Sequence, residues 1–209
     1  MKLTVFGATG GTGKQVVEQA LAAGHEVTAL ARDPGKLGIQ HPKLRVVKGS
    51  LSDAAALEQA VSGVDAVISA LGPRSNDPVF EISQGMEKVV AAMKKCGVKR
   101  LVMTAGMGVA APGDQPNIIN KAIGAMLALA AKNVAEDMRR AVAIAQASGL
   151  DWTVLRAPRL SDRPGGRPLK VGYVGKGIGF ELARADFAKA LLEAATQGKH
   201  VREMPGLSN

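Results

Sequence analysis

The sequence predicts an α/β protein with a Rossmann-like, doubly wound, mostly parallel sheet that carries helices on both faces. Apolar runs of strand length alternate with helical patterns along the chain, which indicates parallel strands joined by crossover helices. A glycine-rich segment follows the first apolar run and precedes the first helical pattern. Aromatic residues make up only 3% of the chain, so aliphatic residues and Met must form most of the core, as in buried parallel strands.

Six apolar runs are predicted to be strands, because each is short and most are separated from the next by a helical pattern. In chain order they are residues 3–6, 26–31, 44–47, 66–69, 101–104 and 152–155. The predicted strands would be parallel, so their carboxyl ends would share one edge of the sheet.

Helical spacing between the strands supports the same architecture. Val16, Val17, Ala20 and Leu21 fall on one face of the first predicted helix, and Gly24 is its expected left-handed terminator. Ser52 and Asp53 are alternative N-caps for the second. The second predicted helix spans residues 54–61. The later ones span residues 82–96, 121–147 and 186–196.

Residues 157–180 differ from the rest of the chain because they are rich in Pro and Gly. This composition predicts a long loop or a short hairpin. Long segments beyond the carboxyl ends of the later strands often cover a ligand in doubly wound folds, so 157–180 is the expected substrate-side wall. No repeat or linker divides the chain, and we expect one domain over residues 1–209.

Charge and cysteine content restrict the functional classes. The net charge is +9, but the Lys and Arg residues are scattered, so we expect attraction of an anionic cofactor and no nucleic-acid binding. Cys96 is the only cysteine, which excludes an intramolecular disulfide and favours a cytoplasmic protein. The first residues enter a strand pattern directly, without a signal peptide. Residues 122–131 are too few to cross a bilayer and are interpreted as a buried helix face, so no membrane association is expected.

The segment from Gly7 to Gly13 carries the strongest functional signal, since it joins the first predicted strand to the first predicted helix. Gly7 permits a sharp exit from the strand, Gly10 lets backbone amides approach a diphosphate, and Gly13 permits close packing of the helix against the sheet. The helix N-terminus adds unpaired amides and a partial positive charge. A glycine-rich turn without a ligand is the alternative. The predicted phosphate-binding residues are Gly7, Thr9, Gly10, Gly11, Thr12 and Gly13.

The residues after the second strand favour NADPH over NADH. Arg32 is the first polar side chain beyond that strand, and its planar donor fork suits the ribose 2′-phosphate, with Lys36 as a second cation. In the alternative, Arg32 points into solvent and Asp33 binds the ribose hydroxyls of NADH. Because Asp33 precedes Pro34, we expect Asp33 to cap the turn that it starts.

Several stretches resemble the atypical, or extended, short-chain dehydrogenase/reductase family, in particular its branch of biliverdin IXβ reductases and NADPH-dependent flavin reductases. The stretches are GATGGTG from Gly7, ALARDPGKL from Ala29, GVDAVISALGP from Gly63, MEKVVAAMKKCGVKRLVMT from Met86 and SGLDWTVLRAP from Ser148. They span nearly the whole chain in the family's order. The resemblance implies NADPH as the cofactor and a set of further site residues. These are Ser50 and Leu51 beside the adenine, Ala70, Leu71 and Gly72 beneath the cofactor, and Thr104, Ala157 and Pro158 near the nicotinamide.

The chain departs from the family at positions that bear on chemistry. Ala105 stands where the flavin reductases have a serine, and Arg159 where they have a histidine. Classical short-chain reductases use a Tyr-x-x-x-Lys pair, for which Lys132 is the matching lysine, but Ala128 occupies the tyrosine position. The only tyrosine, Tyr173, lies in the glycine-rich segment. The proton donor therefore stays open among Thr104, Lys132 and solvent, and the catalytic residues are unknown.

Hydride transfer to a flat, conjugated acceptor needs mainly close stacking against the nicotinamide, whereas a simple ketone needs a positioned acid. We therefore expect an NADPH-dependent oxidoreductase that reduces a flavin, a quinone or a related planar small molecule. The alternative is a redox-sensing regulator of the NmrA-like type that binds NADP(H) with little or no catalysis. An epimerase or dehydratase with tightly held NAD is less consistent with Arg32. The three His residues lie far apart without a carboxylate or thiol group, so no metal site is expected.

Overall fold

The structure, a computed structural model, describes residues 1–73, 75–118, 126 and 129–209. Its strands, in chain order, are β1 Lys2–Phe6, β2 Glu26–Ala31, β3 Leu44–Lys48, β4 Ala66–Ser69, β5 Arg100–Gly106, β6 Asp151–Ala157, β7 Arg159–Ser161, β8 Lys170–Gly172, β9 Glu181–Ala183 and β10 Gly206–Ser208. The main sheet has the order β3-β2-β1-β4-β5-β6-β10-β8. Strands β1 to β6 and β10 pair in parallel, and only β8 is antiparallel, to β10.

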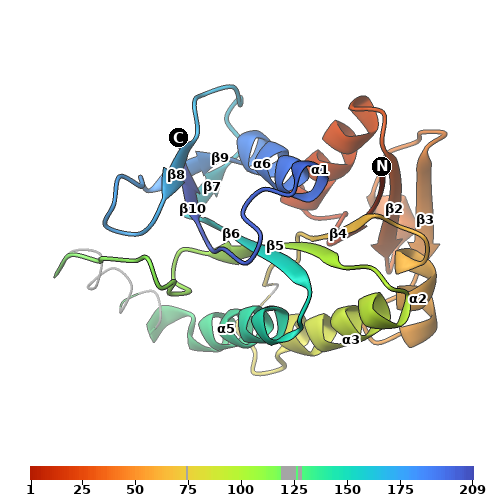
Figure 1. Ribbon diagram of the computed structural model, residues 1–209, viewed down its shortest axis with the longest axis horizontal. Helices are drawn as coiled ribbons and strands as arrows, with labels where there is room; N and C mark the ends of the chain where they lie inside the picture. The colour runs from red at the N-terminus through yellow and green to blue at the C-terminus, as the bar shows by residue number, and fades with distance from the viewer. Residues whose placement is uncertain (74, 119–125, 127–128) are drawn as a thin grey trace.

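Helices cover both faces of the main sheet (Figure 1). They are α1 Gly11–Ala22, α2 Ala54–Val61, α3 Glu81–Lys95, α5 Lys132–Ala147 and α6 Arg184–Gln197, with a short 3₁₀ helix at Pro34–Lys36. Helices α1 and α6 pack together on one face, and α2, α3 and α5 form a row on the other. The predicted Rossmann-like α/β fold is therefore confirmed.

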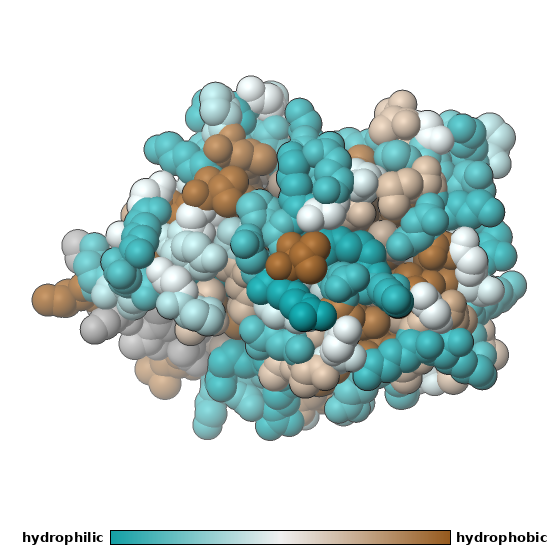
Figure 2. All heavy atoms as spheres, in the orientation of Figure 1, coloured by the Kyte–Doolittle hydropathy of each residue, from teal (hydrophilic) through white to brown (hydrophobic). Residues whose placement is uncertain are grey.

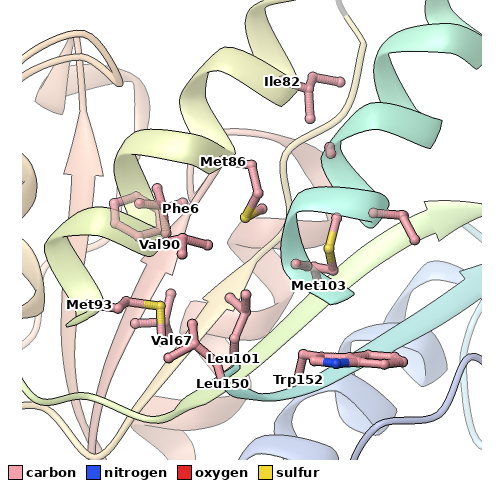
Figure 3. Close-up of a cluster of buried hydrophobic side chains, with 14 of the residues drawn as sticks. Phe6, Val67, Ile82, Met86, Val90, Met93, Leu101, Met103, Leu150 and Trp152 are labelled. Atoms are coloured by element: carbon pink, nitrogen blue, oxygen red, sulfur yellow. The ribbon is translucent and has the colours of Figure 1, made fainter. Parts of the chain in front are cut away.

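Each face of the sheet has its own aliphatic core. On one side, α3 turns Met86, Val90 and Met93 toward the sheet, where they meet Leu101 of β5 and Phe6 of β1 (Figure 3). On the other side, the predicted stripe of α1 is buried against α6 and the sheet. All four of its predicted residues are buried, and Gly24 has the expected positive φ of 82°. The helical spacing therefore identified the buried faces correctly.

All six predicted strands are present, and four of them extend by one or two residues at their ends. Their order β3-β2-β1-β4-β5-β6 is that of a dinucleotide-binding fold. Because these strands are parallel, their carboxyl ends meet at one edge of the sheet. The segments that follow the strands are thereby brought together there.

The prediction of one long helix over residues 121–147 is wrong. Within it, residues 121–125 and 127–128 lie outside the described part, and the chain leaves helical geometry at Ala131, with φ −135° and ψ 50°. Helix α5 starts at Lys132 because Asn76 accepts hydrogen bonds from the amides of Asn133 and Val134, at 3.2 and 3.3 Å. A side chain from the loop after β4 thus caps a new helix, which the local sequence could not indicate.

The interpretation of residues 122–131 as a buried helix face is also wrong for its described members. Met126 and Leu129 are exposed, as is Ile118 shortly before them. On the face drawn in Figure 2, hydrophilic side chains predominate and apolar ones appear in separate patches. In the part of the chain that the structure describes, no helix is long and apolar enough to cross a membrane.

The C-terminal quarter contains short strands that the sequence did not predict. Strand β10 is fully buried between β6 and β8, and β7 pairs in parallel with β9. The segment 157–180 therefore combines loop with β7 and β8. Strands of three residues are too short to show a period, so only their pairing identifies them.

Candidate cofactor-binding site

The predicted site residues lie at the carboxyl ends of parallel strands, along one edge of the sheet. After β1 come the predicted phosphate-binding residues Gly7, Thr9, Gly10, Gly11, Thr12 and Gly13. After β2 come Arg32 and Lys36, after β3 Ser50 and Leu51, and after β4 Leu71 and Gly72. Thr104 lies near the end of β5, and Pro158 follows β6. Order β3-β2-β1-β4-β5-β6 arranges these groups in a row with the glycine loop near its middle. This is the edge at which open α/β sheets bind ligands.

The glycine loop has no room for side chains at two positions. Gly7 has φ 76°, and a Cβ on it would lie 2.6 Å from the carbonyl oxygen of Ala70, directly after β4. A Cβ on Gly13 would overlap the carbonyl oxygen of Gly7, so Gly13 packs on the loop itself. The prediction that Gly13 packs the helix against the sheet is therefore wrong. Gly10 donates its amide to the same oxygen at 3.0 Å. The loop is therefore compact, because glycine at these two positions lets its backbone segments approach one another closely.

Helix α1 begins without a side-chain cap, as α6 does, whereas side chains cap α2 and α3. Its N-cap is Gly10, no side chain accepts from its first amides, and its first turn has no acidic residue. By contrast, Asp53 caps α2, as predicted, and the Asp137 carboxylate accepts from the Ile82 and Ser83 amides of α3 at 2.9 and 2.8 Å. Amides at an uncapped N-terminus, next to a glycine-rich loop, fit a phosphate group.

Positive side chains border the end of β2. Arg32 is exposed directly after that strand. Asp33 accepts from the Gly35 amide at 3.2 Å, which confirms that it caps the turn it starts. Lys36 lies 4.0 Å from Asp33 in an exposed pair. Lys14, which the sequence analysis did not single out, reaches from α1 to within 3.8 Å of the position that a Cβ on Gly38 would take.

The segments after β3 and β4 form the next part of the edge. Ser50 shares a hydrogen bond of 2.7 Å with Ser52, and Leu51 packs closely on Gly85 of α3. Gly72 faces open space and lines a cavity of about 130 Å³ between the loop after β4 and the start of α5. Two charged residues, Arg74 and Asp77, stand in the loop after β4. Asp77 lines this cavity, and Arg74 lies outside the described residues.

Few polar side chains stand at the ends of β5 and β6. Thr104 donates its hydroxyl to the Leu71 carbonyl at 3.3 Å, and Ala105 beside it is buried. Pro158 is half-buried and Arg159 is exposed. Lys132 is exposed at the first residue of α5, while position 128, where classical reductases have tyrosine, lies outside the described residues.

The glycine-rich segment 157–180 is held by a buried ion pair that sequence reasoning missed. Arg156, fully buried in β6, donates from both terminal nitrogens to the Asp114 carboxylate at 2.7 Å. Arg156 also donates to the carbonyls of Val109 and Met204. Asp114 accepts from the Val174 amide at 2.9 Å. The pair thereby joins the loop after β5 to the glycine-rich segment.

Burial raises the pKa of Asp114, but the hydrogen bonds from Arg156 and from two backbone amides outweigh that effect and hold the pKa below its usual value. Tyr173 packs on Gly113 and lies 5.9 Å from the Arg156 guanidinium. The single tyrosine therefore packs beside the Asp114–Arg156 pair.

Arg184 lies beside the glycine loop, and no local sequence pattern could indicate this position. It is the first residue of α6, and its Nη1 donates to the Thr12 hydroxyl of α1 at 3.2 Å. Its Nε donates to Asp162 at 2.7 Å. These contacts span 172 and 22 positions of the chain, so no local pattern reports them. Among the described residues, no group of three or more His, Cys, Asp or Glu side chains is placed to hold a metal ion.

The chain is similar to parts of longer reductases. It is 36% identical over 119 residues to a (4-alkanoyl-5-oxo-2,5-dihydrofuran-3-yl)methyl phosphate reductase of Streptomyces griseus, a match that covers 57% of this chain and 39% of that protein. It is 37% identical over 114 residues to pinoresinol reductase 1 of Arabidopsis thaliana, covering 48% of this chain and 34% of that protein. The matched part is thus between a third and two fifths of the length of these relatives.

Solved structures share the fold over the whole chain. A short-chain dehydrogenase/reductase from Veillonella parvula in complex with NADP has a TM-score of 0.80 and 21% identity, covering 100% of this chain and 94% of the other. A candidate NADH-flavin reductase from Streptococcus pneumoniae has a TM-score of 0.76 and 23% identity, covering 100% and 99%. At these identities the likeness concerns the fold.

The family is shown by a match over most of the sequence. Residues 7–198 match the model of a family described as NAD(P)H-binding. The matched range begins at the first glycine of the loop and ends after α6, so it includes every candidate site residue named above. The predicted resemblance is confirmed at the level of this family, and the chain belongs to the NAD(P)H-binding family.

Proposed function

We propose that this protein is an NADPH-dependent reductase that transfers hydride to a planar, conjugated acceptor such as a flavin or a quinone. One observation carries the choice of acceptor: none of the residues predicted to lie near the nicotinamide, Thr104, Ala157 and Pro158, offers a free side-chain acid. Thr104 has the only hydroxyl among the described residues predicted to lie there, and that hydroxyl donates to Leu71. A ketone substrate would forfeit about two to four powers of ten in rate without a positioned acid, whereas a conjugated acceptor can take its proton from solvent.

In this proposal the cofactor lies along the carboxyl edge of the sheet. The amides of α1 and the glycine loop bind its diphosphate, because no side chain caps the helix and Gly10 and Gly11 have no Cβ. Arg32 binds the ribose 2′-phosphate, with Lys36 and Lys14 adding positive charge. Ser50 and Leu51 lie beside the adenine. When bound, NADPH supplies the hydride, and the protein supplies position and exclusion of water.

The acceptor is proposed to enter from the side of Gly72. The cavity there measures about 130 Å³, which is smaller than the ~300–1,000 Å³ of pockets that enclose a drug-sized ligand. An acceptor as large as a flavin would therefore insert one edge and leave the remainder against the wall built by residues 157–180. Stacking on the nicotinamide would then orient it, without specific polar contacts.

The first prediction concerns turnover. Purified protein is expected to oxidise NADPH when FMN or a quinone is added, and to leave simple ketones unreduced. The measurement is the loss of the reduced-nicotinamide absorbance with each acceptor at equal concentration. The NADPH-binding regulator of the NmrA-like type predicts tight binding without turnover of any planar acceptor, so that result would replace the reductase. Ketone reduction at a comparable rate would contradict the choice of acceptor.

The second prediction concerns cofactor selectivity. Arg32→Ala is expected to weaken NADPH by about 2 kcal/mol, or roughly thirtyfold, because it removes a charged hydrogen bond to the 2′-phosphate. NADH lacks that phosphate and should lose little. Calorimetric titration of both nucleotides measures the difference. Lys2→Ala is the matched control, since it removes one exposed positive charge at the opposite end of β1. Equal losses for NADPH and NADH would contradict recognition by Arg32.

A further inference from the structure

Arg184 holds an unusual position at the start of two helices. As the first residue of α6, it extends over the first turn of α1 and donates to Thr12, the second residue of that helix. A Cβ on Gly11 would lie 3.0 Å from its Nε and 3.1 Å from its Cδ. Glycine at position 11 thus lets the guanidinium lie directly on the helix end. Among the described residues, Nη2 of Arg184 has no hydrogen-bond partner.

The electrostatics of this arrangement favour an anion. A helix N-terminus carries a partial positive charge, so a guanidinium placed there is disfavoured unless negative charge lies nearby. Asp162 supplies one carboxylate, but its side chain is 83% exposed, and exposed ion pairs contribute little. The first turn of α1 contributes no acidic residue, and Asp186 in the first turn of α6 accepts hydrogen bonds from the Gly166 amide and the Asn209 side chain. A phosphate between the α1 amides and Arg184 would satisfy the helix end and the guanidinium together.

We propose that Arg184 is a diphosphate-binding residue of the cofactor site and that Asp162 positions its guanidinium. The inference rests on the proposed binding of a nicotinamide dinucleotide, and it adds a contact from a helix distant in sequence from the glycine loop. Nη1 and Nη2 donate to diphosphate oxygens while Nε keeps its bond to Asp162. Because NADPH and NADH have the same diphosphate, Arg184 contributes equally to both nucleotides. This distinguishes it from Arg32, which selects between them.

The test compares Arg184→Gln and Arg184→Lys with the wild-type chain. Calorimetric titrations with NADPH and NADH are expected to show both affinities reduced by about tenfold to a hundredfold in Arg184→Gln, with their ratio unchanged. Arg184→Lys should recover part of the loss, because it restores the charge without the fork. Lys189→Gln is the control: it removes an exposed charge from the same helix and should leave both affinities unchanged.

A second readout uses inorganic pyrophosphate, which contains the proposed anion without the nucleosides. It is expected to raise the thermal unfolding temperature of the wild-type chain and to have a smaller effect on Arg184→Gln. Unchanged nucleotide affinities in a folded Arg184→Gln variant would overturn the assignment, as would a loss confined to NADPH. If the wild-type chain binds neither nucleotide, the proposed function fails as well, so the two failures are distinguishable.

Discussion

Asp114→Ala is expected to lower the free energy of unfolding by about 3–5 kcal/mol, because it leaves the buried Arg156 guanidinium without its counter-charge. Arg156 has no exposed surface, and both of its bonds to Asp114 are 2.7 Å long. The substitution also removes the acceptor for the Val174 amide, which joins the glycine-rich segment to the loop after β5. Urea unfolding followed by circular dichroism measures the loss.

Two controls separate charge burial from other effects. Glu193→Ala breaks the exposed pair with Lys199 and should cost no more than about 1 kcal/mol. The double variant Asp114→Leu with Arg156→Met removes both charges and should recover part of the loss, since apolar replacement of a buried pair is often tolerated. A single-variant loss as small as that of Glu193→Ala would contradict the importance of the pair.

The same carboxylate predicts a pH dependence. The pKa of Asp114 is lower in the folded chain than its usual value, so its contribution to stability is present above the unfolded-state pKa of about 3.9 and is lost as pH falls through the folded-state pKa. The wild-type chain should therefore lose more stability below about pH 4 than Asp114→Ala does. Parallel acid-unfolding curves for the two proteins would contradict this sign.

Gly13→Ala is expected to weaken NADPH and NADH alike by about two to four powers of ten. The new Cβ would overlap the Gly7 carbonyl, which already accepts from the Gly10 amide, so the loop must move. Such a shift would remove about two charge-assisted hydrogen bonds to the diphosphate, each worth about 1.5–3 kcal/mol. The overlap also costs stability, at about 1–3 kcal/mol for an overpacked site. Titration and thermal unfolding measure the two effects.

Gly24→Ala is the matched control at the other end of α1. Gly24 has φ 82° with nothing within 4 Å of the added Cβ, so alanine there costs only the strain of a left-handed backbone, about 1–2 kcal/mol. Nucleotide affinity should be unchanged. If Gly13→Ala also kept its affinity while losing stability, the glycine loop would be a structural turn and not the phosphate site.

Sequence periodicity predicted the sheet and most helices because burial on a defined face leaves a local record. The aliphatic stripe of α1 and the apolar runs of β1 to β6 needed no tertiary information. Periodicity failed where a distant side chain decides the backbone. Asn76 begins α5 at Lys132, and the apolar composition of the preceding residues predicted one continuous helix instead.

The candidate site divides in the same way. Glycines with a fixed spacing after a strand, and Arg32 directly beyond the next strand, are local features that indicated where a dinucleotide would bind. Arg184 and the Asp114–Arg156 pair were missed because their partners are separated by 172 and 42 positions. A lone arginine in a sequence is most simply interpreted as a solvated surface residue.

By itself, the sequence determined the parallel α/β order, the position of the glycine loop and the family to which the chain belongs, because each depends on neighbouring residues whose spacing matches a strand, a turn or a helix. Only the tertiary structure decided which charges meet across the site, since electrostatic contacts depend on distance in space and not on separation along the chain. The sheet brings the carboxyl ends of β1 to β6 to one edge, and folding then places Arg184 on α1 and buries Arg156 against Asp114.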